Sequence, residues 1–406
     1  MVLVEDHAAP VVSICLTYDV GSRNEKAGRT GFAHLFEHMM FQGSENIGKG
    51  EHFALVGNNG GTMNGSTNAD RTNYYQTLPA NQLDLALFLE ADRMRSLAIT
   101  PANFENQRRT VKEERQQNYD NRAYGRSQEL LHETMYDNFA YKHSTIGSMA
   151  DLDAATLEDA RKFFTVYYAP NNAVLTLVGD FSSAVAMEKI KQLFGGIAAQ
   201  KTPPEPDMAE PEQKEERRQM LDDRLARLTR VDIGFKVPAG NHPDFIALQA
   251  LASILGGGRS SRLHRVLVDE KQVALAASAF AYERRGPGTF QFFATARPGH
   301  EAAEVEKMIL DELAEVQRPK AIEDWELEKV KFASKRAAAE QLRSSLGRAV
   351  SMGQYAVYYG DPGLINRRAE QFAKVTREDL VRVAKKYLTA ENRTVLVTRP
   401  ARKAAQ

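Results

Sequence analysis

Two histidines and a glutamate, placed close together in the sequence, form the pattern in this chain that is best suited to chemistry. The stretch reads His34-Leu35-Phe36-Glu37-His38. In a helix, positions i and i+4 lie one turn apart on the same side, so His34 and His38 can reach one metal ion. Glu37 then lies beside the metal and is not one of its ligands. The spacing therefore predicts the chemistry of a zinc hydrolase.

The helix that must position these side chains is apolar on every side. Its apolar residues are Phe32, Ala33, Leu35, Phe36, Met39, Met40 and Phe41. A helix of this kind is normally buried. The alternative interpretation is a pair of hydrogen-bonded core histidines beside a salt-bridged glutamate. We favour the metal site, because this motif is uncommon by chance in a chain with 9 His among 406 residues.

A third ligand is expected from another element, because a catalytic zinc ion takes three protein ligands and keeps a fourth position for water. The segment 100–119 predicts a second helix, in which Thr100 is the N-cap and Pro101 the first helical residue. Helical spacing continues through Phe104, Arg108 and Val111. This helix carries Glu113 and Glu114. Either could be the ligand, and a solvated acidic face is the alternative for both.

The motif and this second helix together resemble the pitrilysin family of insulinase-type zinc peptidases, whose inverted motif is His-x-x-Glu-His. In that family the third ligand is a Glu that follows another acidic residue by about two turns, in a pattern similar to Glu-Arg-x-x-Val-x-x-Glu. Four residues match this pattern by position: Gln107, Arg108, Val111 and Glu114. The resemblance therefore implies that Glu114 is the ligand and Glu113 its neighbour. Gln107 stands where the family usually has an acid, and its amide could still orient a ligand.

The resemblance also implies a strand that binds substrate. The segment from Gly60 to Thr67 is similar to the family's strand beside the active site, with Asn64 and Gly65 at the matching positions. A sheet edge binds an extended peptide through main-chain hydrogen bonds. The alternative is an ordinary glycine-rich hairpin. A further match begins at Tyr168-Ala169-Pro170-Asn171-Asn172-Ala173 and continues through the strand Val174–Val178.

Composition and length indicate a globular chain with two domains. At 406 residues it exceeds what one core usually organises, and 43% hydrophobic residues suffice for large cores. The formal net charge is +0 with interspersed charges, which argues against nucleic-acid binding. No apolar run is long enough for membrane insertion, and no signal peptide is visible. Cys15, the one cysteine, is expected to be a small buried residue on a strand.

The cellular compartment stays open. Val2 to His7 resembles the middle of the family's first strand, whose beginning usually lies a few residues upstream. We therefore expect a mature or truncated form, from which a removed export signal would be invisible. Bacterial periplasm and cytoplasm remain equally compatible with the sequence.

The chain is predicted to consist of two related halves, 1–200 and 223–406, joined by a charged, proline-containing linker at 201–222. The strand at 173–178 follows Asn172 much as the strand at 393–397 follows Asn392. Strands alternate with amphipathic helices, such as Phe245 to Leu255 and Arg377 to Tyr387. This predicts an α+β fold in which each half is an α/β roll, an antiparallel-rich sheet with helices packed on it. The resemblance implies that the two rolls close around a chamber, and that only the first half binds zinc.

The second half departs from the family at two positions. Gly256 to Leu263 resembles the family's second-half signature, which is commonly followed by an Arg and, seven residues later, a Tyr that bind substrate and stabilise the oxyanion. Val268 and Leu275 occupy these positions, and neither side chain can donate a hydrogen bond. Arg348 and Tyr355 have the same spacing, but they lie on a later predicted helix and are not assigned this role.

The expected function is therefore that of a zinc-dependent endopeptidase acting on short or unfolded peptides. Zinc would be held by His34, His38 and Glu114, and Glu37 would accept the proton of the attacking water. A partner subunit would supply the Arg and Tyr, which makes this chain the metal-bearing subunit of a heterodimer. Two alternatives remain, a self-sufficient homodimeric peptidase and a non-catalytic chamber or scaffold subunit.

Overall fold

The computed structural model describes residues 1–401, which form two compact units. The first unit consists of residues 1–114, 144–207 and 338–367, and the second of residues 115–143, 208–337 and 368 onward. Each unit is thus built from segments that are distant in the sequence. None of the described helices is both long and apolar enough to cross a membrane.

The first unit contains a five-stranded sheet with the order β1-β5-β2-β4-β3. Its strands are β1 (Val2–Glu5), β2 (Val11–Tyr18), β3 (Thr62–Thr67), β4 (Thr72–Pro79) and β5 (Ala173–Gly179). β1 and β5 are parallel, and all other neighbours are antiparallel. Cys15 is fully buried on the central strand β2, as predicted. β3 has one neighbour only, so it forms an edge of the sheet.

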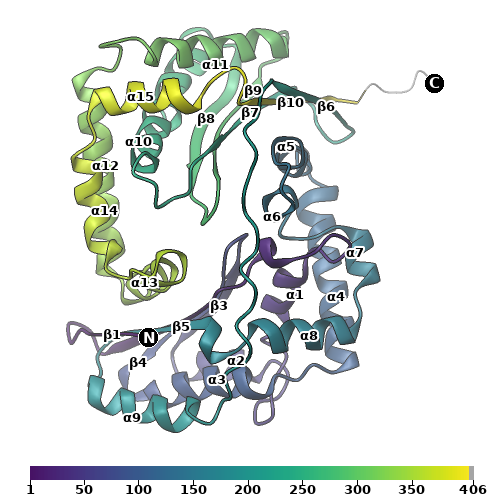
Figure 1. Ribbon diagram of the computed structural model, residues 1–406, viewed down its shortest axis with the longest axis vertical. Coiled ribbons are helices and arrows are strands. Elements are labelled where there is room, and N and C mark those ends of the chain that lie inside the picture. The colour runs from purple at the N-terminus through teal and green to yellow at the C-terminus, as the bar shows by residue number, and fades with distance from the viewer. Residues whose placement is uncertain (402–406) are drawn as a thin grey trace. The chain divides into compact units, whose positions relative to one another are not determined.

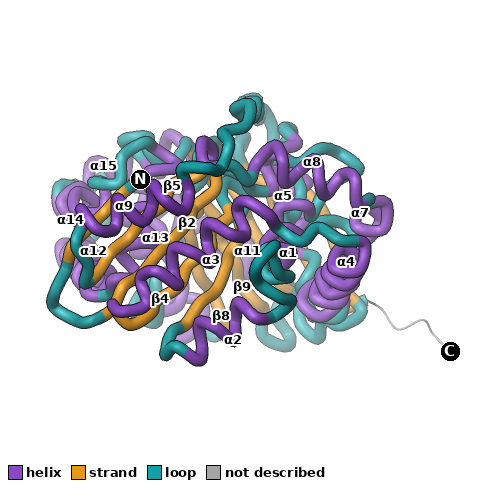
Figure 2. Tube along the Cα trace, turned by 90° about the horizontal axis from the view of Figure 1, so that it is seen from below, coloured by secondary structure: helices purple, strands orange, loops and turns teal. Residues whose placement is uncertain are grey.

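Helices cover both faces of this sheet. The helices formed by N-terminal segments are α1 (Phe32–Met39), α2 (Glu51–Asn58), α3 (Leu83–Ser96), α4 (Pro101–Arg115), α7 (Met149–Ala154), α8 (Leu157–Tyr167) and α9 (Ser183–Phe194). Figure 2 shows α3 and α9 crossing the strands of this sheet, and both helices contact them. A helix from much later in the sequence, α13 (Ser345–Tyr359), packs on β2, β5 and β4 (Figure 1). The second half of the sequence therefore helps to build the first unit.

The second unit repeats this arrangement with the sheet order β6-β10-β7-β9-β8. Its strands are β6 (Arg217–Asp223), β7 (Arg230–Val237), β8 (Ala274–Tyr282), β9 (Gly288–Ala296) and β10 (Arg393–Pro400). The parallel pair is again the first one, β6 and β10. Its helices are α5 (Ser127–Met135), α6 (Phe139–Lys142), α10 (Phe245–Gly256), α11 (Ala302–Val316) and α15 (Arg377–Tyr387). Here α5, from the first half of the sequence, packs on β6, β7 and β10.

Two further helices, α12 (Asp324–Arg343) and α14 (Leu364–Ala373), have residues in both units. Short 3₁₀ or π turns complete the structure at Ser22–Asn24, Ala80–Gln82, Gln116–Asp120, Pro170–Asn172 and His264–Glu270. The α+β fold with two similar halves is therefore confirmed. α15 spans the predicted residues, and α10 extends one residue beyond its predicted end.

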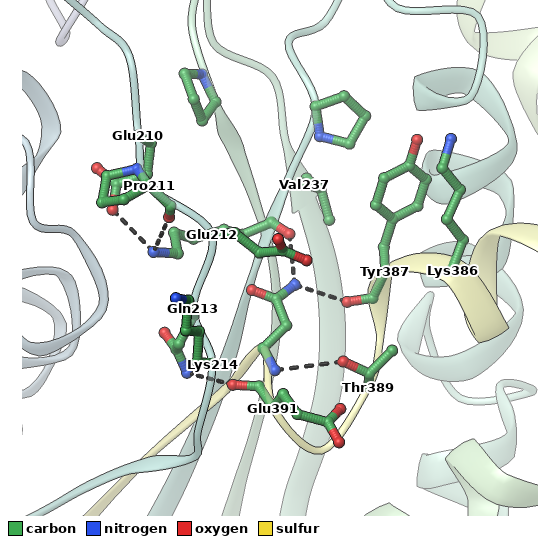
Figure 3. A pocket seen from close by; sticks show the side chains of 14 residues that line it. Glu210, Pro211, Glu212, Gln213, Lys214, Val237, Lys386, Tyr387, Thr389 and Glu391 are labelled. Atoms are coloured by element: carbon green, nitrogen blue, oxygen red, sulfur yellow. Dashed lines mark hydrogen bonds and ion pairs between the residues drawn. The ribbon is translucent and has the colours of Figure 1, made fainter.

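An asparagine anchors the corresponding strand in each unit. Asn172 donates from Nδ2 to the carbonyl oxygens of Asp19 and Tyr167, and Asn392 donates to those of Lys236 and Tyr387. In the second unit this contact lines a cavity of about 770 Å³ (Figure 3). The internal repeat seen in the sequence is thus also a repeat of specific hydrogen bonds.

The connecting segment is fastened to the second unit at the same cavity. Residues 201–214 contain neither helix nor strand, and β6 begins at Arg217. The carboxylate of Glu210 accepts a hydrogen bond from Lys236 Nζ (2.8 Å) and from the backbone N–H groups of Asp137 and Asn138. The predicted division at 201–222 into a zinc-binding half and a second half stays a prediction.

Candidate metal centre

The helix that carries the histidines is fixed at its N-terminus and buried along its length. Gly31 precedes α1 with φ +88°, a left-handed conformation that favours glycine. The carboxylate of Glu25 accepts hydrogen bonds from the N–H groups of Gly31 (2.9 Å) and Ala33 (2.8 Å), which the helix itself leaves unpaired. The apolar residues of the stretch Phe32–Phe41 are at most 8% exposed, which confirms the predicted buried helix.

Three predicted ligands from two helices lie together. Glu114 Oε2 is 3.6 Å from His34 Nε2 and 3.4 Å from His38 Nε2. One ligand atom from each residue lies within 4.8 Å of the other two. Two imidazoles and one carboxylate are a usual donor set for catalytic zinc, which keeps a further position for water. The residues present therefore fit a zinc ion.

The electrostatics of His34 also suit a metal ligand. Burial lowers the pKa of His34 to about 4, and the neighbouring His38 acts in the same direction, while Glu114 opposes both. The imidazole is therefore neutral near pH 7, which is the form that binds metals. Its Nδ1 is buried and has no hydrogen-bond partner among the residues described. Metal-bound histidines normally donate this second N–H to an outer group.

Glu114 is positioned by the helix predicted from Thr100 onward. Thr100 Oγ1 accepts a hydrogen bond from Asn103 N (3.2 Å), and α4 begins at Pro101, as expected. Glu114 lies one helical turn beyond the buried Val111, whereas Glu113 is exposed. Helical spacing left both glutamates as alternatives and the family resemblance implied Glu114; the geometry places the carboxylate of Glu114 beside the histidines.

Gln107 lies two helical turns before Glu114 and is 6% exposed. Its amide donates a hydrogen bond to Asn106 Oδ1 (2.8 Å). The predicted role of Gln107 as a group that orients a ligand stays a prediction.

Glu37 points toward the hairpin formed by β3 and β4. A Cβ atom at Gly65 would lie 3.1 Å from Glu37 Cγ, so the backbone of β3 passes directly beside this side chain. Burial raises the pKa of Glu37, while a hydrogen bond from Thr67 and the charges of His38 and Arg71 lower it in part. A half-buried carboxylate next to the ligand set is suited to proton transfer.

The predicted substrate-binding residues lie on β3, an edge strand of its sheet, where Asn64 is exposed and Gly65 is buried. Asn68 N donates to Arg71 O at the end of the hairpin, and antiparallel pairs alternate between bonded and non-bonded residues. By this alternation Gly65 directs its N–H away from β4. Asn64 is exposed, and its Oδ1 accepts that N–H at 2.8 Å. Asn64 and Gly65 as substrate-binding residues remain a prediction.

Two residues that support α1 were not found by sequence reasoning. Tyr74 OH donates to the carbonyl oxygen of Phe36 (3.2 Å), and the guanidinium of Arg93 lies 4.4 Å from the Tyr74 ring centroid. Glu25, which caps the helix, is the second. An acid shortly before a glycine-bounded helix could have suggested Glu25, whereas Tyr74 makes a long-range contact that gives no local signal.

That Val268 and Leu275 stand where the family has its Arg and Tyr stays a prediction. Val268 lies in the π-helical turn His264–Glu270, and Leu275 on β8 is 50% exposed. Arg348 of α13 forms an ion pair with Asp6, in agreement with its not being assigned to oxyanion stabilisation.

Comparison with known proteins identifies the family. The family profile described as Insulinase (Peptidase family M16) matches residues 1–149, and the profile described as Peptidase M16 inactive domain matches residues 154–334. Zinc protease PqqE of Helicobacter pylori is 34% identical over 392 residues, which cover 96% of this chain and 88% of that protein. The chain therefore belongs to the pitrilysin (insulinase, M16) family of zinc peptidases, and its metal cofactor is zinc.

Solved structures show the same fold. The crystal structure of a protease from Helicobacter pylori superposes with a TM-score of 0.94 at 33% identity, covering 98% of this chain and 97% of that one. A peptidase M16 inactive domain from Pseudomonas fluorescens gives a TM-score of 0.87 at 18% identity, covering 100% and 96%. Among sequences, a probable mitochondrial-processing peptidase subunit beta from Arabidopsis thaliana is 24% identical over 308 residues, covering 71% of this chain and 56% of that protein.

Proposed function

We propose that this chain is the zinc-bearing subunit of an endopeptidase that cleaves short or unfolded peptides. The observation that carries the proposal is the convergence of His34, His38 and Glu114, with Glu37 beside them. Zinc, when bound, polarises a substrate carbonyl and makes water acidic enough to be deprotonated near neutral pH.

Glu37 and the edge strand β3 would contribute proton transfer and substrate binding. Glu37 accepts the proton of the attacking water and passes it to the leaving amine, and its raised pKa makes the protonated form easier to reach. The edge strand β3, at Asn64 and Gly65, would hold an extended peptide through its main chain. Such recognition depends little on side chains, which agrees with unfolded peptides as the substrate class.

We further propose that a homologous partner chain completes the site. Val268 and Leu275 cannot donate hydrogen bonds to an oxyanion, and loss of one such donor typically reduces turnover by about a hundredfold or more. A homodimer that uses other donors is the alternative. A non-catalytic scaffold is favoured by the likeness to a domain described as inactive, but retention of the three ligands and Glu37 argues against it.

The test is peptidase activity on a quenched, unstructured peptide, with zinc content measured in parallel. The purified chain is assayed alone and with a homologous subunit from its source, beside Glu37→Gln. Stoichiometric zinc with activity only after mixing supports the heterodimer, and activity of the chain alone supports the homodimer. A chain that binds no zinc and gains no activity would contradict the peptidase proposal and leave the scaffold.

The double variant Val268→Arg/Leu275→Tyr sharpens this test. If the missing donors alone explain a need for a partner, this variant gains activity without one. The single variants are the matched controls, and each is expected to remain dependent on the partner.

A further inference from the structure

The turn between β3 and β4 is organised by the side chain of Asn68. Its Oδ1 accepts the N–H groups of Asp70 (2.8 Å) and Arg71 (2.9 Å), while its backbone N–H donates to Arg71 O (3.0 Å). Such side-chain-to-backbone bonds fix the conformation of a tight turn. Asn68 therefore helps to fix how the hairpin closes, together with main-chain hydrogen bonds from Ser22 and Arg23 to the turn.

This asparagine is itself held by a residue from the far end of the sequence. Asn68 Nδ2 donates to the hydroxyl of Tyr358 at 3.0 Å, and the same hydroxyl lies 3.2 Å from Asn68 Oδ1. Tyr358 is 6% exposed and lies in the last turn of α13. The hydroxyl is thus a fixed partner in a buried environment, where a hydrogen bond is difficult to replace with water.

Close contacts keep α13 in place on the sheet. A Cβ atom at Gly353 would lie 2.6 Å from Thr17 Oγ1, so a larger residue would force the Thr17 side chain or the helix to move. Ser345 Oγ lies 2.9 Å from Ser13 Oγ at the other end of the helix. Because α13 contacts the sheet at two separate points, Tyr358 can act as a rigid support for Asn68.

The turn is connected directly to the residues beside Glu37. Thr67 precedes Asn68 and interacts with Glu37, and Gly65 contacts the same side chain two residues earlier. By the alternation of bonded pairs, Gly65 and Thr67 direct their main-chain groups away from β4, toward the edge side of β3, where Asn64 Oδ1 accepts the N–H of Gly65. A displaced turn would therefore shift the peptide-binding edge relative to Glu37, which is carried by α1.

We propose that Tyr358 is a positioning residue, which holds the β3–β4 turn through Asn68 so that the peptide-binding edge stays in register with Glu37. This inference rests on the proposed peptidase function and adds to it a contribution from the second half of the sequence within the first unit. It predicts that loss of the hydroxyl weakens peptide binding more than turnover, because the metal ligands on α1 and α4 are not moved.

The test compares Tyr358→Phe with Tyr359→Phe, which removes a hydroxyl from the next residue of the same helix. With a partner present where one is needed, Tyr358→Phe is expected to raise KM about three- to tenfold, with kcat within about twofold and unchanged zinc content. Asn68→Ser keeps a turn-capping oxygen but is too short to reach Tyr358. In the double variant Asn68→Ser/Tyr358→Phe, KM is expected to equal that of Asn68→Ser alone. An unchanged KM in Tyr358→Phe would overturn the proposal, and so would additive effects of the two substitutions on KM in the double variant.

Amide hydrogen exchange separates this inference from the peptidase proposal. Faster exchange in residues 62–71 of Tyr358→Phe, but not of Tyr359→Phe, is expected whether or not the enzyme turns over substrate. Equal exchange in both variants contradicts the role of Tyr358. An inactive wild-type chain with the expected exchange pattern contradicts the peptidase function alone.

Discussion

The side chain of Glu37 packs against the backbone of Gly65, and a Cβ atom at position 65 would lie 3.1 Å from Glu37 Cγ. The proposed base is therefore held between its own helix and the edge strand that would carry the substrate. Through Gly65, the proposed base is in contact with the strand that would bind the peptide. This contact also makes the size of residue 65 a sensitive test of the site.

Substitutions at Gly65 should reduce activity in order of size. Gly65→Ala requires neighbours to move by only a few tenths of an ångström, so we expect a small loss. Gly65→Val adds two methyl groups against Glu37 and Tyr74, and we expect at least about a tenfold loss of kcat/KM with zinc retained. Steady-state kinetics with zinc analysis checks this. The control is Gly57→Ala, where nothing lies within 4 Å of the added atom; equal activity of all three variants would contradict the prediction.

The two neighbouring glutamates of α4 should differ in metal binding. Glu114→Ala removes the carboxylate next to both histidines, and we expect zinc affinity to fall by about a hundredfold or more. Glu113→Ala is the matched control, because that side chain is exposed and should leave affinity unchanged. Competition with a chelating indicator measures both. Zinc loss in Glu113→Ala with retention in Glu114→Ala would reverse the assignment.

Chelation should destabilise the chain through the same ligands. An ion that binds only the folded state adds about 2.7 kcal/mol when its concentration is a hundred times its Kd. We therefore expect chelated protein to unfold at a lower temperature and added zinc to restore the transition. In Glu114→Ala, the unfolding temperature should differ much less between chelated and zinc-supplemented protein. An equal shift in that variant would show that zinc stabilises the chain at another site.

Removing the cap of α1 should cost stability. Glu25 is 8% exposed and accepts two hydrogen bonds from backbone N–H groups at the helix start. Glu25→Ala leaves these donors buried without a partner, and we expect the free energy of unfolding to fall by about 1–3 kcal/mol. Denaturant titration measures the change. Glu188→Ala, at a side chain 78% exposed, is expected to stay within about 0.5 kcal/mol; similar losses in both variants would contradict a specific cap.

Stability of the second unit should depend on Asp244 at acidic pH. Burial raises its pKa, but hydrogen bonds from Tyr387, Arg382 and Lys386 outweigh burial and lower the pKa to about 2. A lowered folded-state pKa contributes stability that is complete above the unfolded value near 3.8 and is lost as pH falls toward 2. Asp244→Asn should therefore cost about 1–2 kcal/mol near neutral pH.

The cost of Asp244→Asn should diminish as the pH falls from about 4 to 2. Unfolding curves of wild type and variant across this range measure the difference. Asp311→Asn is the control, because its carboxylate is 59% exposed and pairs with Lys307 on the same helix. A cost that does not change with pH would show that packing, and not the charge of Asp244, carries the effect.

Local spacing in the sequence was sufficient for the metal helix and for the repeated architecture. His34 and His38 share one helix face because four residues complete about one turn. Asn172 and Asn392 mark equivalent strands because each must anchor the same connection before β5 or β10. These features depend on residues that are close together in the sequence, so the sequence specifies them directly.

Only the tertiary structure decided which distant groups meet. Helical periodicity does not choose between Glu113 and Glu114, and the family resemblance implies Glu114; the fold brings the carboxylate of Glu114 to 3.6 Å from His34 and 3.4 Å from His38. Likewise α5, from the first half of the sequence, packs on the sheet of the second unit, and α13, from the second half, packs on the sheet of the first unit. The position of α13 places Tyr358 beside Asn68. The physical reason is that periodicity fixes the face of an element, whereas the choice of packing partner depends on the whole buried core.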